Sequence, residues 1–207
     1  MEKNRFFNID LLKAISIFGV VYIHSYDLLG FDLLSQIFQP LFRIAVPSFI
    51  IIWAYFFEKS FQKVDRKVFF ILEKFKKLFI VFIFWSIIYF LISFDSNNIS
   101  LKSFITKHMS GYGWSGQYFF IILFQLIIFY PFIRKIYSLK WLRFLIIILV
   151  FIYYFVFSYT SLIPKPFSVV GIRPFVFWLP YVFLGIYFQR CSVNLAKSIP
   201  IKYLVIP

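Results

Sequence analysis

Two titratable side chains, Lys13 and His24, lie eleven residues apart inside the first hydrophobic stretch of this chain. On an α-helix, eleven residues turn through ~1100°, about 20° past three full turns, so both side chains project from one face, ~16 Å apart along the axis. Ionisable side chains within a membrane span usually face a bundle interior or a water-filled cavity, and they mark a pathway or a reaction site. The alternatives are that Lys13 extends to the nearby membrane surface and that His24 is a hydrogen-bonded packing residue.

Each of these residues has an acidic residue three positions away. Asp10 precedes Lys13 at a spacing where helix side chains meet, so we expect an ion pair that makes either charge easier to bury. Asp27 follows His24 and could orient the imidazole, as carboxylates do in other histidine sites. The alternative is that Asp27 is simply solvated at the end of the span.

A guanidinium, that of Arg43, lies near the start of the second hydrophobic stretch. With antiparallel neighbouring spans, we predict that His24 and Arg43 lie at the same depth, ~7–8 Å below the outer surface, in one polar pocket. A nearby cation favours the neutral imidazole, which is the form that a general base requires. Alternatively, Arg43 extends to the outer interface. Pro47 lies four residues further on and is expected to kink the helix.

The composition is that of a membrane protein. The 207 residues are 62% hydrophobic, 25% aromatic and only 14% charged, and the mean hydropathy is +0.86. Soluble domains are typically ~45–50% apolar and ~25% charged. The net charge of +14 is explained by basic cytoplasmic loops rather than by nucleic-acid binding. The single Cys191 excludes an intrachain disulfide framework.

Hydropathy divides the chain into six apolar segments near the ~20 residues that a span needs. We predict helical spans at about Ile9–Leu29, Phe38–Phe57, Leu78–Phe94, Gln117–Ile133, Leu142–Tyr159 and Pro174–Phe188. Sixteen of the 22 Lys and Arg residues then fall on the side of the N-terminus. Because basic residues collect in cytoplasmic loops, we predict an all-α polytopic transmembrane helix bundle with a cytoplasmic N-terminus, in which residues 1–207 form a single membrane domain.

Other polar residues give weaker signals. Gln117 and Gln125, on the fourth segment, are expected to make interhelix hydrogen bonds. Trp114 belongs to an outer aromatic belt or stacks on a sugar ring, and His108 has no obvious partner in the sequence. The sequence has no phosphate-cradling glycine loop and no zinc-binding His/Cys cluster, so we predict no metal site.

Asp10, Lys13, ten further residues and then His24 form one pattern, and the segment from Arg43 through Pro47 to Phe49 forms a second. Both patterns resemble segments of the integral-membrane acyltransferase 3 family, which often has Arg at the position of Lys13. Weaker likenesses follow in the family's order and cover nearly all of the chain: Lys74–Ser86, Gln117–Pro131 and Phe177–Gly185.

Members of this family O-acetylate cell-surface polysaccharides and other extracytoplasmic acceptors. The resemblance therefore implies a membrane-bound O-acyltransferase of the cell membrane, multi-pass and bacterial, with acetyl-CoA as donor and a polysaccharide or other glycan as acceptor. It implies that His24 takes the proton of the acceptor hydroxyl or briefly carries the acyl group, and that Arg43 stabilises the oxyanion or positions the acceptor. Lys13, with Asp10, would contact the anionic donor.

Two alternatives belong to other functional classes. Intramembrane charge suits a transporter or flippase for a sugar-linked or polar solute equally well. Because family members are usually longer, the chain resembles their N-terminal part, and a non-catalytic, C-terminally truncated fragment of a longer acyltransferase is the other alternative. Consumption of acetyl-CoA distinguishes the enzyme from the transporter.

Overall fold

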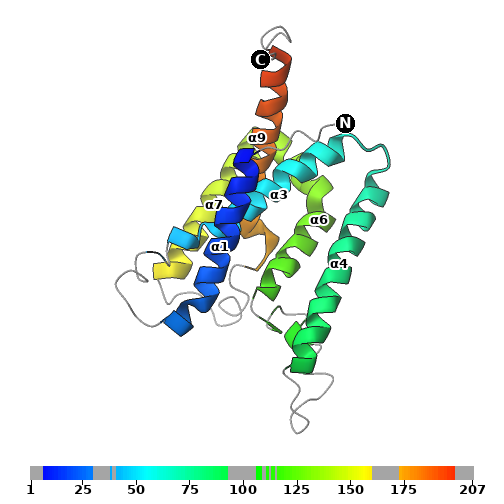
Figure 1. Cartoon of the computed structure of the whole chain (residues 1–207). Helices are drawn as coiled ribbons and strands as arrows, with labels where there is room; N and C mark the ends of the chain where they lie inside the picture. Colours follow the sequence, from blue (N-terminus) through cyan, green and yellow to red (C-terminus); the bar gives the residue numbers. More distant parts are fainter. Residues whose placement is uncertain are drawn as a thin grey trace, which may run out of the picture. The chain divides into compact units, whose positions relative to one another are not determined.

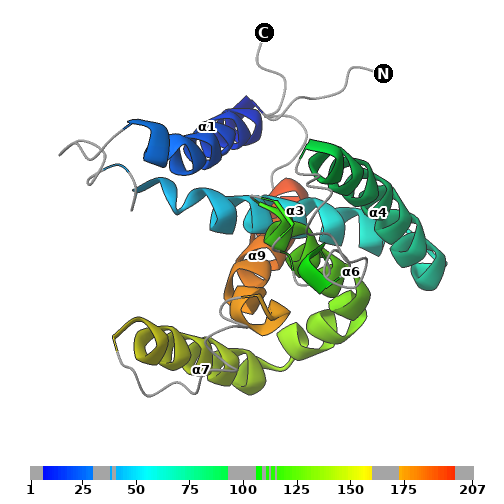
Figure 2. The ribbon, with the colours of Figure 1, turned by 90° about the horizontal axis from the view of Figure 1, so that it is seen from below.

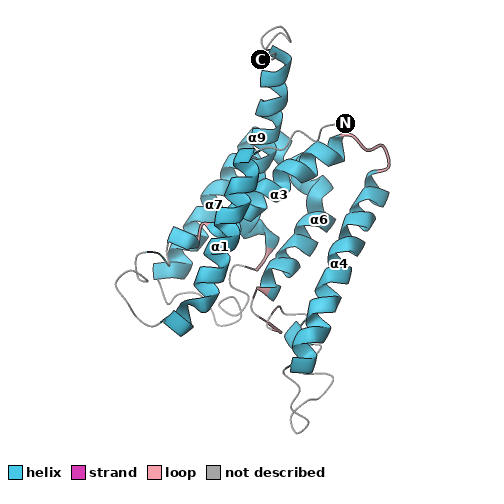
Figure 3. Cartoon of the chain, viewed as in Figure 1, coloured by secondary structure: helices cyan, strands magenta, loops and turns pink. Residues whose placement is uncertain are grey.

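The computed structural model of the chain is mainly helical in the residues that it describes, with short loops between helices, and no strand occurs among them (Figures 1 and 3). The described residues are 7–29, 38, 41–92, 106–108, 111, 113–114, 116–159 and 173–198. Their helical elements are α1 (Phe7–Leu29), α3 (Ala45–Gln62), α4 (Lys67–Ile92), α6 (Gln117–Ser138), α7 (Lys140–Tyr159), the 3-10 helix η1 (Phe175–Trp178) and α9 (Leu179–Ser198). The predicted all-α class is confirmed.

Each of the six apolar segments predicted from hydropathy contains a helix, but several helix ends lie elsewhere. Helix α4 begins at Lys67, well before the predicted Leu78, and its polar turns carry an i, i+4 ion pair between Lys77 and Glu73 at 2.5 Å. Hydropathy ends a segment at its charges, whereas a helix continues wherever charged side chains can reach solvent.

The second predicted span, Phe38–Phe57, is interrupted near its start. Leu41 and Phe42 are helical, Arg43 and Ile44 form a turn, and α3 then begins at Ala45. Pro47 explains the interruption, because its ring lacks an N–H and clashes with the carbonyl four residues back, that of Arg43. Within the first turn of α3 the same proline is tolerated, since the N–H that it lacks would have had no intrahelical partner.

Helices α4 and α6 are long and apolar enough to cross a membrane, with mean hydropathies of 2.1 and 1.9. Large apolar side chains of α4 point outward instead of into a core: Phe69 is 66% exposed, Phe84 is 58% exposed and Ile92 is 76% exposed. Such a surface suits lipid rather than water. The six crossings and the cytoplasmic N-terminus are not decided by these helices, and they stay predictions.

Contacts group the chain into two compact units, which we describe separately. The first unit comprises residues 1–63 and 181–207, and thus α1, α3 and nearly all of α9. The second unit comprises residues 64–180, with α4, α6, α7 and η1. The prediction of one membrane domain over residues 1–207 is not tested by this grouping.

In the first unit, α1 lies antiparallel along α3 and the segment before it (Figure 2). Near the start of α1, the Lys13 ammonium lies 5.1 Å from the ring centroid of Phe56. Further along, the rings of Tyr22 and Phe42 are 4.9 Å apart. Gly19 lies between these two levels and packs against Phe42 and Ala45. These contacts run from Lys13 to Tyr22 on α1.

Helix α9 crosses the other side of α3 at Gly185 (Figure 2). A Cβ added at Gly185 would lie 2.4 Å from the carbonyl oxygen of Ile51 and 2.6 Å from the Cβ of Ala54. Only glycine allows backbones to approach this closely, as at other small-residue contacts between membrane helices. Val182 and Ile186, on either side of this contact, are fully buried.

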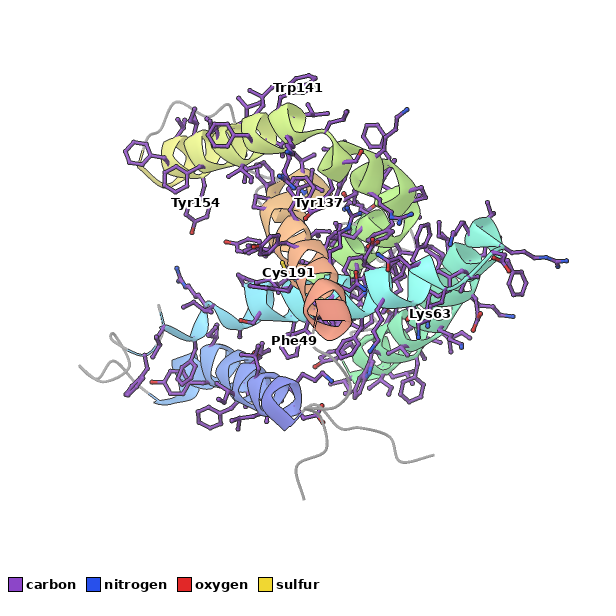
Figure 4. All side chains as sticks on the ribbon, turned by 90° about the horizontal axis from the view of Figure 1, so that it is seen from above. Phe49, Lys63, Tyr137, Trp141, Tyr154 and Cys191 are labelled. Carbon is purple, nitrogen blue, oxygen red and sulfur yellow. The ribbon has the colours of Figure 1, made fainter. Side chains whose placement is uncertain are left out.

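In the second unit, α6 packs against α4 through phenylalanine rings, among them Phe82 and Phe124 at 5.4 Å. Leu139 is the single non-helical residue between α6 and α7, and its extended backbone reverses the chain. The Arg143 guanidinium lies 4.8 Å from the ring of Tyr137 across this turn. Trp141 projects outward from the start of α7 and is 67% exposed (Figure 4).

Candidate functional site

The first unit carries the residues that the sequence singled out. Lys13 and Asp10 form the expected ion pair, with 3.1 Å between Nζ and Oδ1. Their side chains are 39% and 54% exposed, so the pair lies at the surface of α1 rather than in the core. Contact with the Phe56 ring adds a cation–π interaction that draws the ammonium towards α3. Lys13 is thus held by one anion and one aromatic face.

Arg43 lies in the turn before α3, and its side chain is exposed. Because Pro47 prevents a regular helix here, the guanidinium starts from a turn rather than from the helix interior. The amide N–H of Ile44 donates to the carbonyl of Leu41 at 3.3 Å, which closes that turn. Arg43 therefore lies in a turn, and not within a continuous helix as predicted for Phe38–Phe57.

His24 lies within helix α1, but its side chain and that of Asp27 are outside the described residues. The register of the helix pair still gives an estimate of level. Gly19 and Tyr22 lie beside Phe42, so Arg43 is level with about residues 19–21 of α1, roughly one turn (~5 Å) short of His24. The structure confirms that the two elements are neighbours. The polar pocket between His24 and Arg43 stays a prediction.

A second polar group in the first unit, which sequence reasoning missed, joins α3 to α9. Glu58 is fully buried, and its Oε1 lies 3.4 Å from Nη2 of Arg190. The amide of Gln62 donates to Oε1 of Glu58 at 2.7 Å and to Oε1 of Gln189 at 3.1 Å. We call these four residues the Glu58 cluster. Its only sequence signal is the i, i+4 spacing of Glu58 and Gln62 at the end of an apolar run.

In the second unit, Gln117 is fully buried and makes the expected interhelix hydrogen bond, from Nε2 to Oγ of Ser86 at 3.2 Å. The same Nε2 lies 2.9 Å from Nδ1 of His108, and Oε1 accepts from the N–H of Gly113 at 2.6 Å. His108 therefore has a partner, contrary to the impression from the sequence. Burial, and after it the charge of Lys107, lowers the pKa of His108 and favours its neutral form.

Gln125 also makes the expected contact between elements. It donates to the carbonyl of Arg173 at 3.3 Å and accepts from the N–H of Phe175 at 3.1 Å, which anchors η1 on α6. Trp114 stacks on Tyr89, with ring centroids 5.3 Å apart. This stacking on a neighbouring helix gives Trp114 a packing role; neither an aromatic belt nor sugar stacking is tested by it.

Chemically, the first unit presents cations near both ends of the α1–α3 pair. The Lys13 ammonium lies at the start of α1, and the Arg43 guanidinium lies in the turn before α3. Such a layout can bind anionic groups or stabilise a developing oxyanion. Within the part of the chain that the structure describes, no three His, Cys, Asp or Glu side chains are grouped to hold a metal ion.

Comparison with known families gives one match. A family model described as an acyltransferase domain matches residues 6–207. Comparison with curated proteins and with solved structures gave no match. The matched range includes α1, the turn at Arg43 and every helix described above.

Proposed function

Because the chain belongs to the acyltransferase 3 family, a membrane-associated family, we propose that it is a multi-pass O-acetyltransferase of a bacterial plasma membrane. It transfers the acetyl group of acetyl-CoA to a hydroxyl of an extracytoplasmic polysaccharide or other glycan. The observation that carries this proposal is the family match, which covers the chain from α1 to its last residues.

Acetyl transfer to a hydroxyl needs a base and a group that stabilises negative charge. In the proposed reaction, His24 takes the proton as the acceptor oxygen bonds to the acetyl carbon. The carbon–sulfur bond of the thioester then breaks, and the thiolate of coenzyme A leaves. Alternatively, His24 carries the acetyl group briefly before the hydroxyl attacks. Arg43 stabilises the oxyanion that forms between these bond changes, or it positions the acceptor.

The packing of α1 against α3 supports these roles. His24 lies about one turn beyond the level of Arg43, and the two residues are on neighbouring elements, a separation that a long arginine side chain can bridge. The turn at Arg43 and Ile44 leaves the guanidinium exposed.

The donor end of the proposed site lies at Lys13, towards the predicted cytoplasmic side. A coenzyme A thioester carries phosphates, which an ammonium can bind through its three N–H donors. Asp10 offsets the charge of Lys13, so the pair carries no net positive charge. It would bind an anionic donor only together with other cations. The Lys13 side chain is 39% exposed, so it is not covered by the other described residues of the first unit.

The test is acetyl transfer in membranes that contain the protein, with labelled acetyl-CoA and measurement of both label in surface glycan and release of the coenzyme A thiol. We expect His24→Ala to lower the rate at least 100-fold, the usual contribution of a general base. Ile17→Ala, an exposed position on the same helix, is the matched control and should retain the wild-type rate. A wild-type rate in His24→Ala would remove this histidine from the chemistry, and solute transport without thiol release would favour the transporter.

A further inference from the structure

The Glu58 cluster combines a buried anion with a partly exposed cation. Glu58 has no exposed side-chain surface, whereas Arg190 is 37% exposed. The guanidinium therefore extends from a buried carboxylate to the surface of the first unit. Removing a carboxylate from water is unfavourable unless charge and hydrogen bonds compensate, and here Arg190 and Gln62 supply both.

The amides of Gln62 and Gln189 complete the cluster. Gln189 is nearly buried, and the two side chains exchange hydrogen bonds of 3.1 and 3.4 Å across the α3–α9 contact. Gln62 thus holds the carboxylate of Glu58 and the neighbouring helix at once. Apolar residues of similar volume usually stabilise a core as well as a buried ion pair does, so stability alone gives little reason for this arrangement.

We propose that Arg190 is a phosphate-binding residue and that Glu58 is the positioning residue that fixes its guanidinium. A guanidinium matches the geometry of phosphate oxygens, and a fixed one loses less side-chain entropy on binding. The ligand is assigned with the help of the proposed function: it is a phosphate of the coenzyme A donor. A lipid head group offers the same chemistry, and the experiment below separates the two sources.

Arg190 and Lys13 contact the same part of α3. Lys13 contacts Phe56 on one side of α3, and Arg190 contacts Glu58, two residues further on. Both cations therefore lie at the same turn of α3 but on different sides of it, because residues two apart on a helix point ~200° apart. Arg190 would thus bind a phosphate of the donor other than one held by Lys13.

The experiment measures binding of coenzyme A to the full chain in lipid nanodiscs by titration calorimetry. We expect Arg190→Gln to weaken binding by about 10- to 100-fold, the loss of hydrogen bonds to a charged group. Arg190→Lys keeps the charge but loses the planar fork, so its affinity for coenzyme A should lie between those of the wild type and Arg190→Gln. The affinity of Glu58→Gln should lie in the same range. Lys63→Gln, which removes an exposed positive charge at the end of α3, is the matched control and should bind like the wild type.

A second arm compares the melting temperatures of these proteins in phosphatidylglycerol and in phosphatidylcholine nanodiscs. If Arg190→Gln binds coenzyme A normally but loses stabilisation by phosphatidylglycerol, the phosphate belongs to a lipid. Equal behaviour of Arg190→Gln and the wild type in both arms overturns the inference, as does equal weakening by Lys63→Gln, or a wild type that responds to neither ligand. If Arg190→Gln does not fold, Arg190→Lys decides by the same criteria.

Failure of the proposed function is separable from failure of this inference. Coenzyme A binding is measured without turnover, so a protein that binds it through Arg190 but transfers no acetyl group would contradict the enzyme and retain the site. Conversely, an active enzyme whose Arg190→Gln variant passes both arms unchanged would retain the function and remove the site.

Discussion

The crossing of α3 and α9 allows a sharp prediction for Gly185→Ala. The new Cβ would lie 2.4 Å from the carbonyl oxygen of Ile51 and 3.0 Å from the backbone nitrogen of Tyr55. The nearest contact is about 1 Å short of ordinary van der Waals distance, and its atoms are backbone, which no rotamer change can move. The helices must therefore separate.

The expected size of the effect follows from two opposing contributions. Overpacking in a well-packed contact destabilises by about 1–3 kcal/mol. Replacing a helical glycine by alanine stabilises the helix by about 1 kcal/mol. Because the clashing atoms are backbone, we expect the upper end of the overpacking range and a net destabilisation of about 2 kcal/mol, which for a chain of this size lowers the melting temperature by about 4–8 °C.

Gly19→Ala is the matched control, because Gly19 is also a helical glycine of the first unit. Its added Cβ would meet Cδ1 of Phe42 at 2.9 Å, on a ring that can rotate, and Cβ of Ala45 at 3.3 Å, and neither contact is as short as the 2.4 Å at Gly185. We expect the helix-propensity gain to offset this smaller clash, so the melting temperature should stay within about 2 °C of the wild type.

The assay is the thermal melting of purified protein in one detergent, followed by coenzyme A titration. Arg190 lies five residues after Gly185, about 7.5 Å along α9, so separating the helices should also lengthen the 3.4 Å ion pair with Glu58. Coenzyme A affinity should then fall in Gly185→Ala and not in Gly19→Ala. A Gly185→Ala protein that melts at or above the wild-type temperature would refute the close backbone contact.

Two further predictions concern the second unit. Gln117→Leu leaves the hydrogen-bonding groups of Ser86, His108 and Gly113 without their buried partner, so we expect about 2–4 kcal/mol lower stability, read as a drop in melting temperature; an unchanged value would contradict the network. Because the folded-state pKa of His108 is lowered, the unfolded chain takes up this proton first on acidification. Its contribution to stability is complete above about pH 6.5 and is lost as the pH falls through the folded-state pKa. Between pH 8 and 5, the melting temperature of His108→Gln should vary less with pH than that of the wild type. An equal pH dependence in the two proteins would show that His108 is not its source.

The positions of the helices could be predicted because each apolar run is long and uninterrupted, as in α6 and α7. Their ends could not, because local chemistry decides them. Pro47 acts on the carbonyl of Arg43 and moves the start of α3, and the Glu73–Lys77 pair lies in polar turns of α4 that hydropathy leaves out. A hydropathy profile contains neither effect.

The polar contacts divide in the same way. The Asp10–Lys13 ion pair could be predicted, because helix geometry brings residues three apart together. The pairing of Glu58 with Arg190 could not, because 132 residues separate the two in the chain and only the packing of α9 on α3 brings them into contact.

The start of α7 fixes how this helix can respond to its surroundings. Trp141 is exposed, and Arg143 lies over Tyr137, the combination of aromatic and basic side chains that settles at head-group level. From Lys140 to Tyr159, the 20 residues of α7 measure about 30 Å, close to one hydrocarbon thickness. In the proposed multi-pass arrangement, α7 would therefore tilt in a thinner bilayer and would not shift along the membrane normal. Lipid acyl-chain length would then set the tilt angle of α7.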